Sequence, residues 1–202
     1  MSRLQTLIAV AASLIVADAA LAQAVTADPA AVKSGVFKVE HHTQVSFSIS
    51  HLGLSDYQGF FRDPSGELTL DVKNPAASKL TITVPVDTIT STVPQLDTLL
   101  KTKAWFDVAT YPTATFVSTS IRRTGDGTAV IEGNLTMHGV TKPVTLNAKL
   151  IGSGTNLVSK AYSVGFSASG ALKRSDFGMK TLLPALTDDV TLNVTGSFEA
   201  KP

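Results

Sequence analysis

Three of the four histidines, His41, His42 and His51, lie within eleven residues of one another. Histidine is the commonest metal ligand and a frequent general acid or base near neutral pH, so this group is the first candidate for chemistry. Adjacent side chains point in different directions in a strand or turn, so His41 and His42 cannot both face one site. We expect these two histidines to lie on the surface.

His51 ends the segment VSFSISH, in which apolar and polar residues alternate. Val45, Phe47 and Ile49 have the same parity as His51, which therefore falls on the apolar face at the end of a predicted strand. The plainest interpretation is a partly buried histidine bonded to the backbone or to a loop. A second interpretation places His51 inside a barrel or at its mouth, in contact with the polar end of a ligand, and a third makes it a metal ligand.

Other signals for catalysis or metal binding are weak. A zinc site needs three or four convergent donors, and beside His51 only His138 can be named, which we expect to face outwards or to cap a turn with Gly139. The chain has no cysteine, which excludes disulfides, thiolate metal sites and cysteine nucleophiles. No serine lies in a Gly-x-Ser-x-Gly elbow. We therefore predict no catalytic residue, no metal and no cofactor.

The elements that position these side chains are mostly strands. Alternation of apolar and polar residues is typical of strands with one apolar face, and it recurs in six segments: 45–51, 68–72, 80–86, 144–150, 162–168 and 190–198. Weaker strand candidates are 113–121 and 128–138. The segment 94–106 has apolar residues at helical spacing and predicts one short amphipathic helix. The irregular stretch 173–189 is long for a hairpin and is a candidate mouth or lid.

About eight antiparallel strands with one apolar face form either a sandwich or a closed barrel. Serine, threonine and asparagine on the second face favour a single sheet whose other side meets water, and closure removes exposed edges. An eight-stranded barrel is just wide enough inside for side chains or one small ligand. We therefore predict an all-β barrel with one short helix.

The start of the chain predicts export. Arg3 precedes an apolar run that ends in small residues, and a cut after Ala22 or Ala24 fits a signal peptidase site. No segment has the roughly 20 apolar residues of a membrane-spanning helix. The net charge of +1, without a basic run among aromatics, argues against nucleic acid as a partner. We expect a signal peptide at 1–22, a flexible lead-in at 23–35 and a single domain at 36–202.

Four ordered stretches resemble landmark motifs of the YceI-like family. They are FSISHLGLSDYQGFF (47–61), WFDVATYPTATFVSTS (105–120), GNLTMHGVTKPVTL (133–146) and KRSDFGM (173–179). Together they span nearly the whole predicted mature chain. One departure is LDTLL (96–100), where the family often shows Arg-Asp-x-His-Leu and only Asp97 and Leu100 match. This departure leaves the headgroup preference open and does not affect the fold.

The resemblance implies an extended, lipocalin-like antiparallel barrel in the periplasm. Such a protein would hold a long-chain polyisoprenoid or a similar fatty amphiphile, such as a prenyl diphosphate, a quinone or a fatty amide, as carrier or reservoir. The alternatives are an enzyme or accessory factor that acts on such lipids, and a structural or stress-protective protein with a packed interior. A homodimer is a further open alternative, because small exported barrels often pair.

Candidate ligand-binding residues lie on the inward faces and at the barrel ends. Packing in the core is the alternative for the apolar ones, and solvation at the surface is the alternative for Arg174. Arg174, in the long loop, suits a diphosphate through its forked donors, and Trp105 and Phe106 either close the mouth or pack inside. The candidates are Phe47, Ile49, His51, Ile82, Val84, Leu99, Trp105, Phe106, Phe116, Leu135, Met137, Tyr162, Val164, Phe166, Arg174 and Phe177.

Overall fold

The computed structural model describes residues 25–201, so the predicted signal peptide and the first two residues of the predicted lead-in lie outside the described residues. Eleven strands in this range form one sheet. They are β1 (Val25–Thr26), β2 (Gly35–Val39), β3 (Gln44–His51), β4 (Ser55–Phe61), β5 (Ser65–Leu70), β6 (Lys79–Pro85), β7 (Thr113–Gly125), β8 (Thr128–Met137), β9 (Val140–Thr155), β10 (Tyr162–Lys173) and β11 (Leu186–Ala200). The helix is α1 (Pro94–Leu100), and the 3-10 turns are η1 (Pro29–Ala31), η2 (Pro75–Ala77), η3 (Val86–Thr88) and η4 (Arg174–Phe177).

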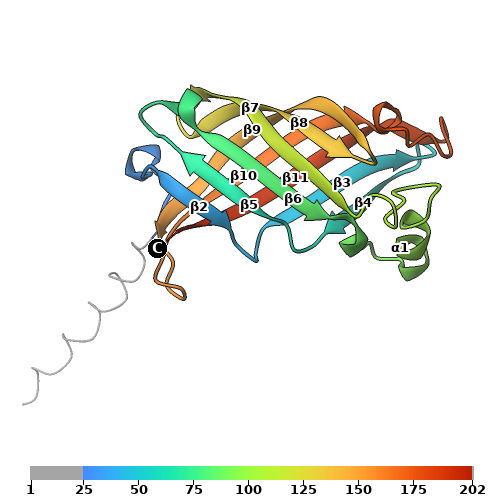
Figure 1. The fold of residues 1–202 in the computed structure, drawn as a ribbon, viewed down its shortest axis with the longest axis horizontal. Coiled ribbons are helices and arrows are strands. Elements are labelled where there is room, and N and C mark those ends of the chain that lie inside the picture. The colour runs from blue at the N-terminus through green and yellow to red at the C-terminus, as the bar shows by residue number, and fades with distance from the viewer. Residues whose placement is uncertain (1–24, 202) are drawn as a thin grey trace, which may run out of the picture.

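Eight of these strands close into an antiparallel barrel. The pairing runs β2, β5, β6, β7, β8, β9, β10, β11, and β11 pairs with β2 to complete the circuit. In Figure 1 the barrel is elongated, with α1 near one end and the described termini at the other. The prediction of an extended eight-stranded antiparallel barrel with one short helix is confirmed.

Strands β3 and β4 lengthen one side of the barrel towards α1 (Figure 1). β3 pairs with the first two thirds of β11 and β2 with its last residues, so β2 and β3 lie end to end along one edge of β11. β4 pairs with β3 and, through a bridge from Phe60 to Thr90, with the loop before α1. The predicted strands include neither β2 nor β4. SDYQGFF in β4 lacks alternation, and its inward Gly59 makes room for the ring of Phe47.

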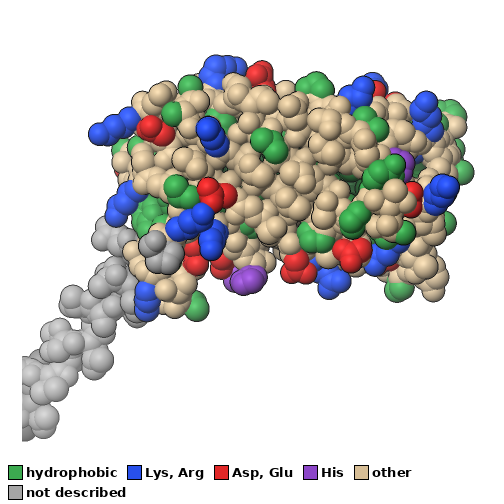
Figure 2. Space-filling model, in the orientation of Figure 1, with side chains coloured by type: hydrophobic (Ala, Val, Ile, Leu, Met, Phe, Trp, Pro, Cys, Tyr) green, Lys and Arg blue, Asp and Glu red, His purple; other side chains and the backbone are tan. Residues whose placement is uncertain are grey.

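Inward-facing and outward-facing positions along the strands differ sharply in their exposure to solvent. In β9 the four residues Val144, Leu146, Ala148 and Leu150 are buried, and the three residues between them are exposed. Figure 2 shows the surface of one face, where the middle of the barrel wall carries few charges and charged side chains gather towards the ends and margins. The apolar faces therefore lie inside the closed sheet, as alternation predicts.

The helix α1 is shorter than the predicted segment 94–106. The Thr102 hydroxyl donates to the Leu99 carbonyl at 2.7 Å, which competes with continued helical bonding. The amide of Phe106 then donates to the Leu100 carbonyl, and the amide of Trp105 donates to the Thr102 carbonyl. The chain from residue 101 onwards is therefore a series of turns that brings both aromatic side chains to the barrel end.

The described part of the predicted lead-in is held against the barrel. β1 pairs with β9, Val25 opposite Gly154. The Tyr162 hydroxyl donates to the carbonyl of Ala31 and accepts from the amide of Lys33, both at 3.1 Å. These contacts lay η1 across the end of the barrel where both described termini lie.

Candidate functional site

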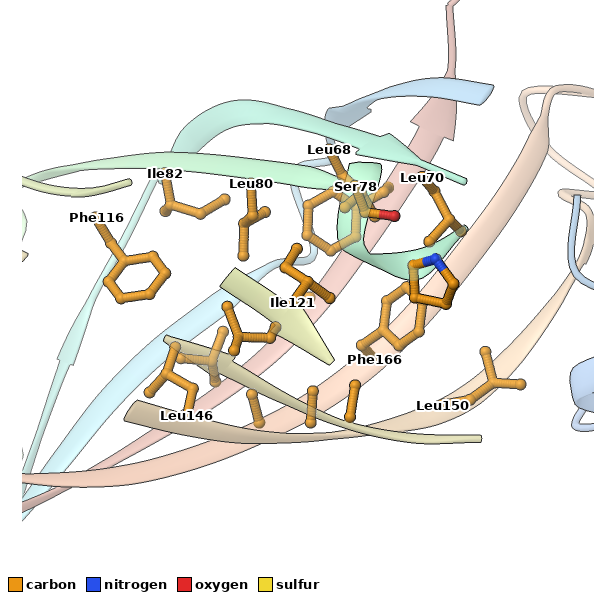
Figure 3. A pocket seen from close by; sticks show the side chains of 18 of the residues that line it. Leu68, Leu70, Ser78, Leu80, Ile82, Phe116, Ile121, Leu146, Leu150 and Phe166 are labelled. Carbon is orange, nitrogen blue, oxygen red and sulfur yellow. The ribbon is translucent and has the colours of Figure 1, made fainter. Parts of the chain in front are cut away.

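The barrel encloses an apolar cavity of about 280 Å³. Its wall is formed by inward side chains of β3 and of β5 to β11, and Figure 3 shows part of this lining. The labelled members are Leu68, Leu70, Ser78, Leu80, Ile82, Phe116, Ile121, Leu146, Leu150 and Phe166. The volume lies close to the lower end of the range of small-molecule sites, roughly 300–1,000 Å³.

A row of small side chains leaves this space open. Ala129 on β8 lies opposite Ala148 on β9, which in turn lies opposite Ala168 on β10. All three line the cavity, and Gly196 on β11 lines it as well. Larger side chains at these positions would fill the interior, so the alanine row is the feature of the sequence that keeps the barrel hollow.

Aromatic side chains close the barrel end next to α1. The rings of Phe47, Phe61 and Phe106 are in mutual contact, with centroids 5.7 to 6.4 Å apart. Trp105 is buried in the same cluster together with Ile49. Phe106 packs against both this cluster and the cluster around the cavity, so it joins the two clusters.

The loop between β10 and β11 packs over the same end. Phe177 is 1% exposed and belongs to the main core. The Arg174 side chain, in a residue only 4% exposed, donates to four backbone carbonyls of its own loop and of the start of β11. Burial lowers the pKa of Arg174, and the charge of Asp188 opposes that shift. The guanidinium therefore organises the loop from inside.

The opposite end of the cavity is its mouth. Polar lining residues gather there: Asp71 and Ser78 flank η2, and Arg123 and Thr128 flank the turn between β7 and β8. The Arg123 side chain is 54% exposed although it lines the cavity, so the cavity reaches the surface beside it. η1 and η2 cover part of this mouth through Pro29 and Pro75.

Residues 37–198 match the YceI-like domain family. The chain belongs to this family. Among its relatives, protein YceI of Escherichia coli O17:K52:H18 is 41% identical over 158 residues, which cover 78% of this chain and 82% of the relative. A UPF0312 protein of Yersinia pestis is 41% identical over 155 residues, which cover 77% and 80% of the two chains.

Solved structures share the YceI-like fold. The crystal structure of Burkholderia cenocepacia BcnA superposes with a TM-score of 0.71 at 24% identity, over 79% of this chain and 98% of that one. A polyisoprenoid-binding domain from Saccharophagus degradans superposes with a TM-score of 0.61 at 13% identity, over 84% of this chain and all of that one. At these identities the likeness concerns the fold alone.

The candidate ligand residues of this YceI-like chain fall into three groups. Five line the cavity: Ile82, Val84, Phe116, Leu135 and Phe166. Nine lie away from the cavity wall, in the aromatic end cluster or the surrounding core: Phe47, Ile49, Trp105, Phe106, Met137, Tyr162, Val164, Arg174 and Phe177. Two are exposed, Leu99 and His51.

The histidines take structural or surface positions. His51 is exposed at the end of β3, which corrects the expectation of a partly buried side chain. His41 and His42 are exposed as predicted, and the His42 ring is 3.0 Å from Glu40. The His138 ring forms a hydrogen bond with the Phe177 carbonyl at 2.9 Å, and it lies tilted against the ring of Tyr111. Within residues 25–201, no three His, Asp or Glu side chains converge as metal ligands would.

Several lining residues are absent from the candidates predicted from sequence. Leu68, Leu80 and Val144 lie on alternating apolar faces, so the pattern could have supplied them. Arg123 carried no such signal, because a bulge in β7 decides which way it points. Within the described range, no helix has both the length and the apolar character needed to cross a membrane.

Proposed function

We propose that this protein binds a long-chain isoprenoid or similar apolar chain inside the barrel and acts as its carrier or reservoir. The observation that carries the proposal is the apolar cavity, closed by aromatic rings at one end and rimmed by polar groups at the other. The name of the Saccharophagus degradans neighbour, a polyisoprenoid-binding domain, agrees with this function. The predicted signal peptide supports a location in the periplasm, which cell fractionation would test.

Burial of hydrocarbon supplies the binding energy. Each buried CH₂ contributes about 0.8 kcal/mol, so ten buried carbons contribute roughly 8 kcal/mol before the costs of ordering and association are subtracted. Such a site needs few polar contacts. The titratable side chains found in the described cavity lining are Asp71 and Arg123, and this mostly apolar lining favours binding over acid–base catalysis.

Mass spectrometry of an organic extract tests the proposal directly. We expect a stoichiometric prenyl or acyl species from the native protein and none from protein that was denatured and refolded. Ala148→Phe fills the middle of the alanine row and should abolish the bound species. Asn147→Phe is the matched control, because it places the same side chain on the outer face of β9.

The two variants also separate binding from folding. Because Ala148 faces empty space, the larger side chain should leave the melting temperature close to that of the wild type. If Ala148→Phe carries as much lipid as Asn147→Phe, the cavity is not the binding site. An empty native extract, with no thermal shift on addition of prenyl alcohols, quinones or fatty amides, would refute the carrier function.

A further inference from the structure

A β-bulge directs the side chain of Arg123 into the mouth of the cavity. Ala114 and Phe116 face inwards on β7, and the register with β8 then slips by one residue at Thr119. Ile121 and Arg123 consequently point inwards, although their parity is opposite to that of Phe116. The bulge thus places Arg123 at the mouth of the cavity, where its side chain is 54% exposed.

Arg123 has donors to offer a ligand. Its Nε donates to the carbonyl of Gly125 at 3.0 Å, and its Nη2 donates to Asp126 Oδ1 at 2.7 Å. These contacts use two of the five N–H groups of a guanidinium. The Asp126 side chain is 94% exposed, and such a surface ion pair contributes little and yields easily to another acceptor.

The other polar side chains of the lining offer fewer donors. The single hydroxyl of Thr128 accepts from the Thr124 hydroxyl at 3.1 Å. Asp71 Oδ1 accepts from the amides of Lys73 and Asn74. Ser78 accepts from the Asp71 amide at 2.9 Å. Thr43 exchanges two hydrogen bonds with the backbone of Ser197. Arg123 is therefore the described lining residue with the most unused donors.

The closed end of the cavity disfavours a polar headgroup. The rings of Phe47, Phe61 and Phe106 lie beyond the cavity wall at that end. A phosphate placed there would lose its water without gaining hydrogen bonds, and this desolvation is costly. At the mouth a headgroup keeps part of its hydration and meets a cation.

We propose that the bound chain enters tail first and that Arg123 recognises an oxygen-rich anionic headgroup, of the phosphate class, at the mouth. The inference rests on the proposed function, since it concerns the same cavity. Forked, charged donors suit phosphate oxygens. Arg123 is then a specificity-determining residue, and the apolar wall binds the tail whatever its headgroup.

The test compares two ligands that share the same tail and two arginine variants on the same strand. Geranylgeranyl phosphate and geranylgeraniol are titrated into the wild type, Arg123→Gln and Arg122→Gln. Arg122 is exposed and does not line the cavity, so both variants lose the same charge and only one loses it at the mouth. We expect Arg123→Gln to weaken phosphate binding about tenfold or more and to leave alcohol binding unchanged, with Arg122→Gln close to the wild type.

The outcomes separate the two proposals. Three results would overturn the headgroup assignment and leave the lipid-binding function standing. In the first, Arg123→Gln loses affinity for both ligands equally; in the second, it loses affinity for neither; in the third, Arg122→Gln changes the affinities as much as Arg123→Gln does. If the wild type binds neither ligand, both the isoprenoid function and the headgroup assignment fail.

Discussion

Replacing Arg174 by methionine should lower stability and leave the lipid affinity unchanged. Nε donates to the Thr187 carbonyl at 2.8 Å and Nη2 to the Leu186 carbonyl at 2.8 Å, while Nη1 donates to Met179 and Thr181 at 3.1 and 2.8 Å. These bonds join the two sides of the loop over the closed end. The guanidinium contacts the loop backbone, and it is not part of the cavity lining.

The expected magnitude follows from these contacts. A net hydrogen bond from a charged donor is worth about 1.5–3 kcal/mol, and desolvation of the guanidinium offsets part of the total. Loss of the side chain leaves the carbonyls of Met179 and Leu186 without their buried partner, at about 1–3 kcal/mol each. We expect the free energy of unfolding to fall by about 3–5 kcal/mol. For a chain of this length the melting temperature should fall by roughly 6–20 °C.

Urea unfolding followed by tryptophan fluorescence measures the effect, because Trp105 is the only tryptophan and is buried at the same end. Lys173→Met is the matched control. Lys173 forms an exposed ion pair with Asp189, so its loss should leave the stability close to that of the wild type. If Arg174→Met unfolds like the wild type but loses its lipid, the guanidinium serves the ligand and the structural argument is wrong.

Gly59→Ala should lower the free energy of unfolding by about 1–3 kcal/mol, because a Cβ there would overlap the ring of Phe47 in the aromatic end cluster. Thermal unfolding checks it, and a variant as stable as the wild type would show that the ring has room to move. Asp97→Asn should make the free energy of unfolding fall less steeply as the pH is lowered. The side chain and the backbone of Ser91 both donate to the Asp97 carboxylate and hold its pKa below the ordinary 3.8. A carboxyl whose folded pKa is depressed stabilises the fold above its unfolded pKa and loses that contribution as the pH falls through the folded value. Urea unfolding between pH 7 and 2 should therefore show that the wild type and Asp97→Asn differ less in free energy of unfolding below about pH 4. A difference that stays the same at every pH would contradict this account.

Local patterns predicted much of the fold. Each of the six alternating segments overlaps a strand, and the interior of β9 follows its alternation residue by residue. Five cavity residues, such as Ile82 and Phe116, could be selected in the same way. The predicted strands missed β2 and β4, and in β4 Gly59 occupies an inward position that the ring of its cross-strand partner Phe47 fills. The helix was predicted too long because Thr102 ends it through a side-chain bond.

Arg123, the proposed headgroup residue, shows why alternation along one strand was insufficient to predict which side chains point inwards. Counting in twos from Phe116 would place Arg122 inside the barrel, and the bulge at Thr119 places Arg123 there instead. A bulge depends on how two strands register against each other, which a single strand does not encode visibly. Arg174 was expected at a ligand because guanidinium suits phosphate, but its four acceptors come from backbone that the loop folds around it.

By itself the sequence determined the family, through its ordered motifs, and which strand faces are apolar, because alternation is a local property of each strand. Only the tertiary structure decided which end of the barrel is open. Phe47, Phe61 and Phe106 come from separate segments and meet to close one end. Ala129, Ala148 and Ala168 come from three neighbouring strands and form one row of small side chains, which keeps the cavity open. Pairing between strands sets which of these residues meet, so their spacing along the chain does not reveal it.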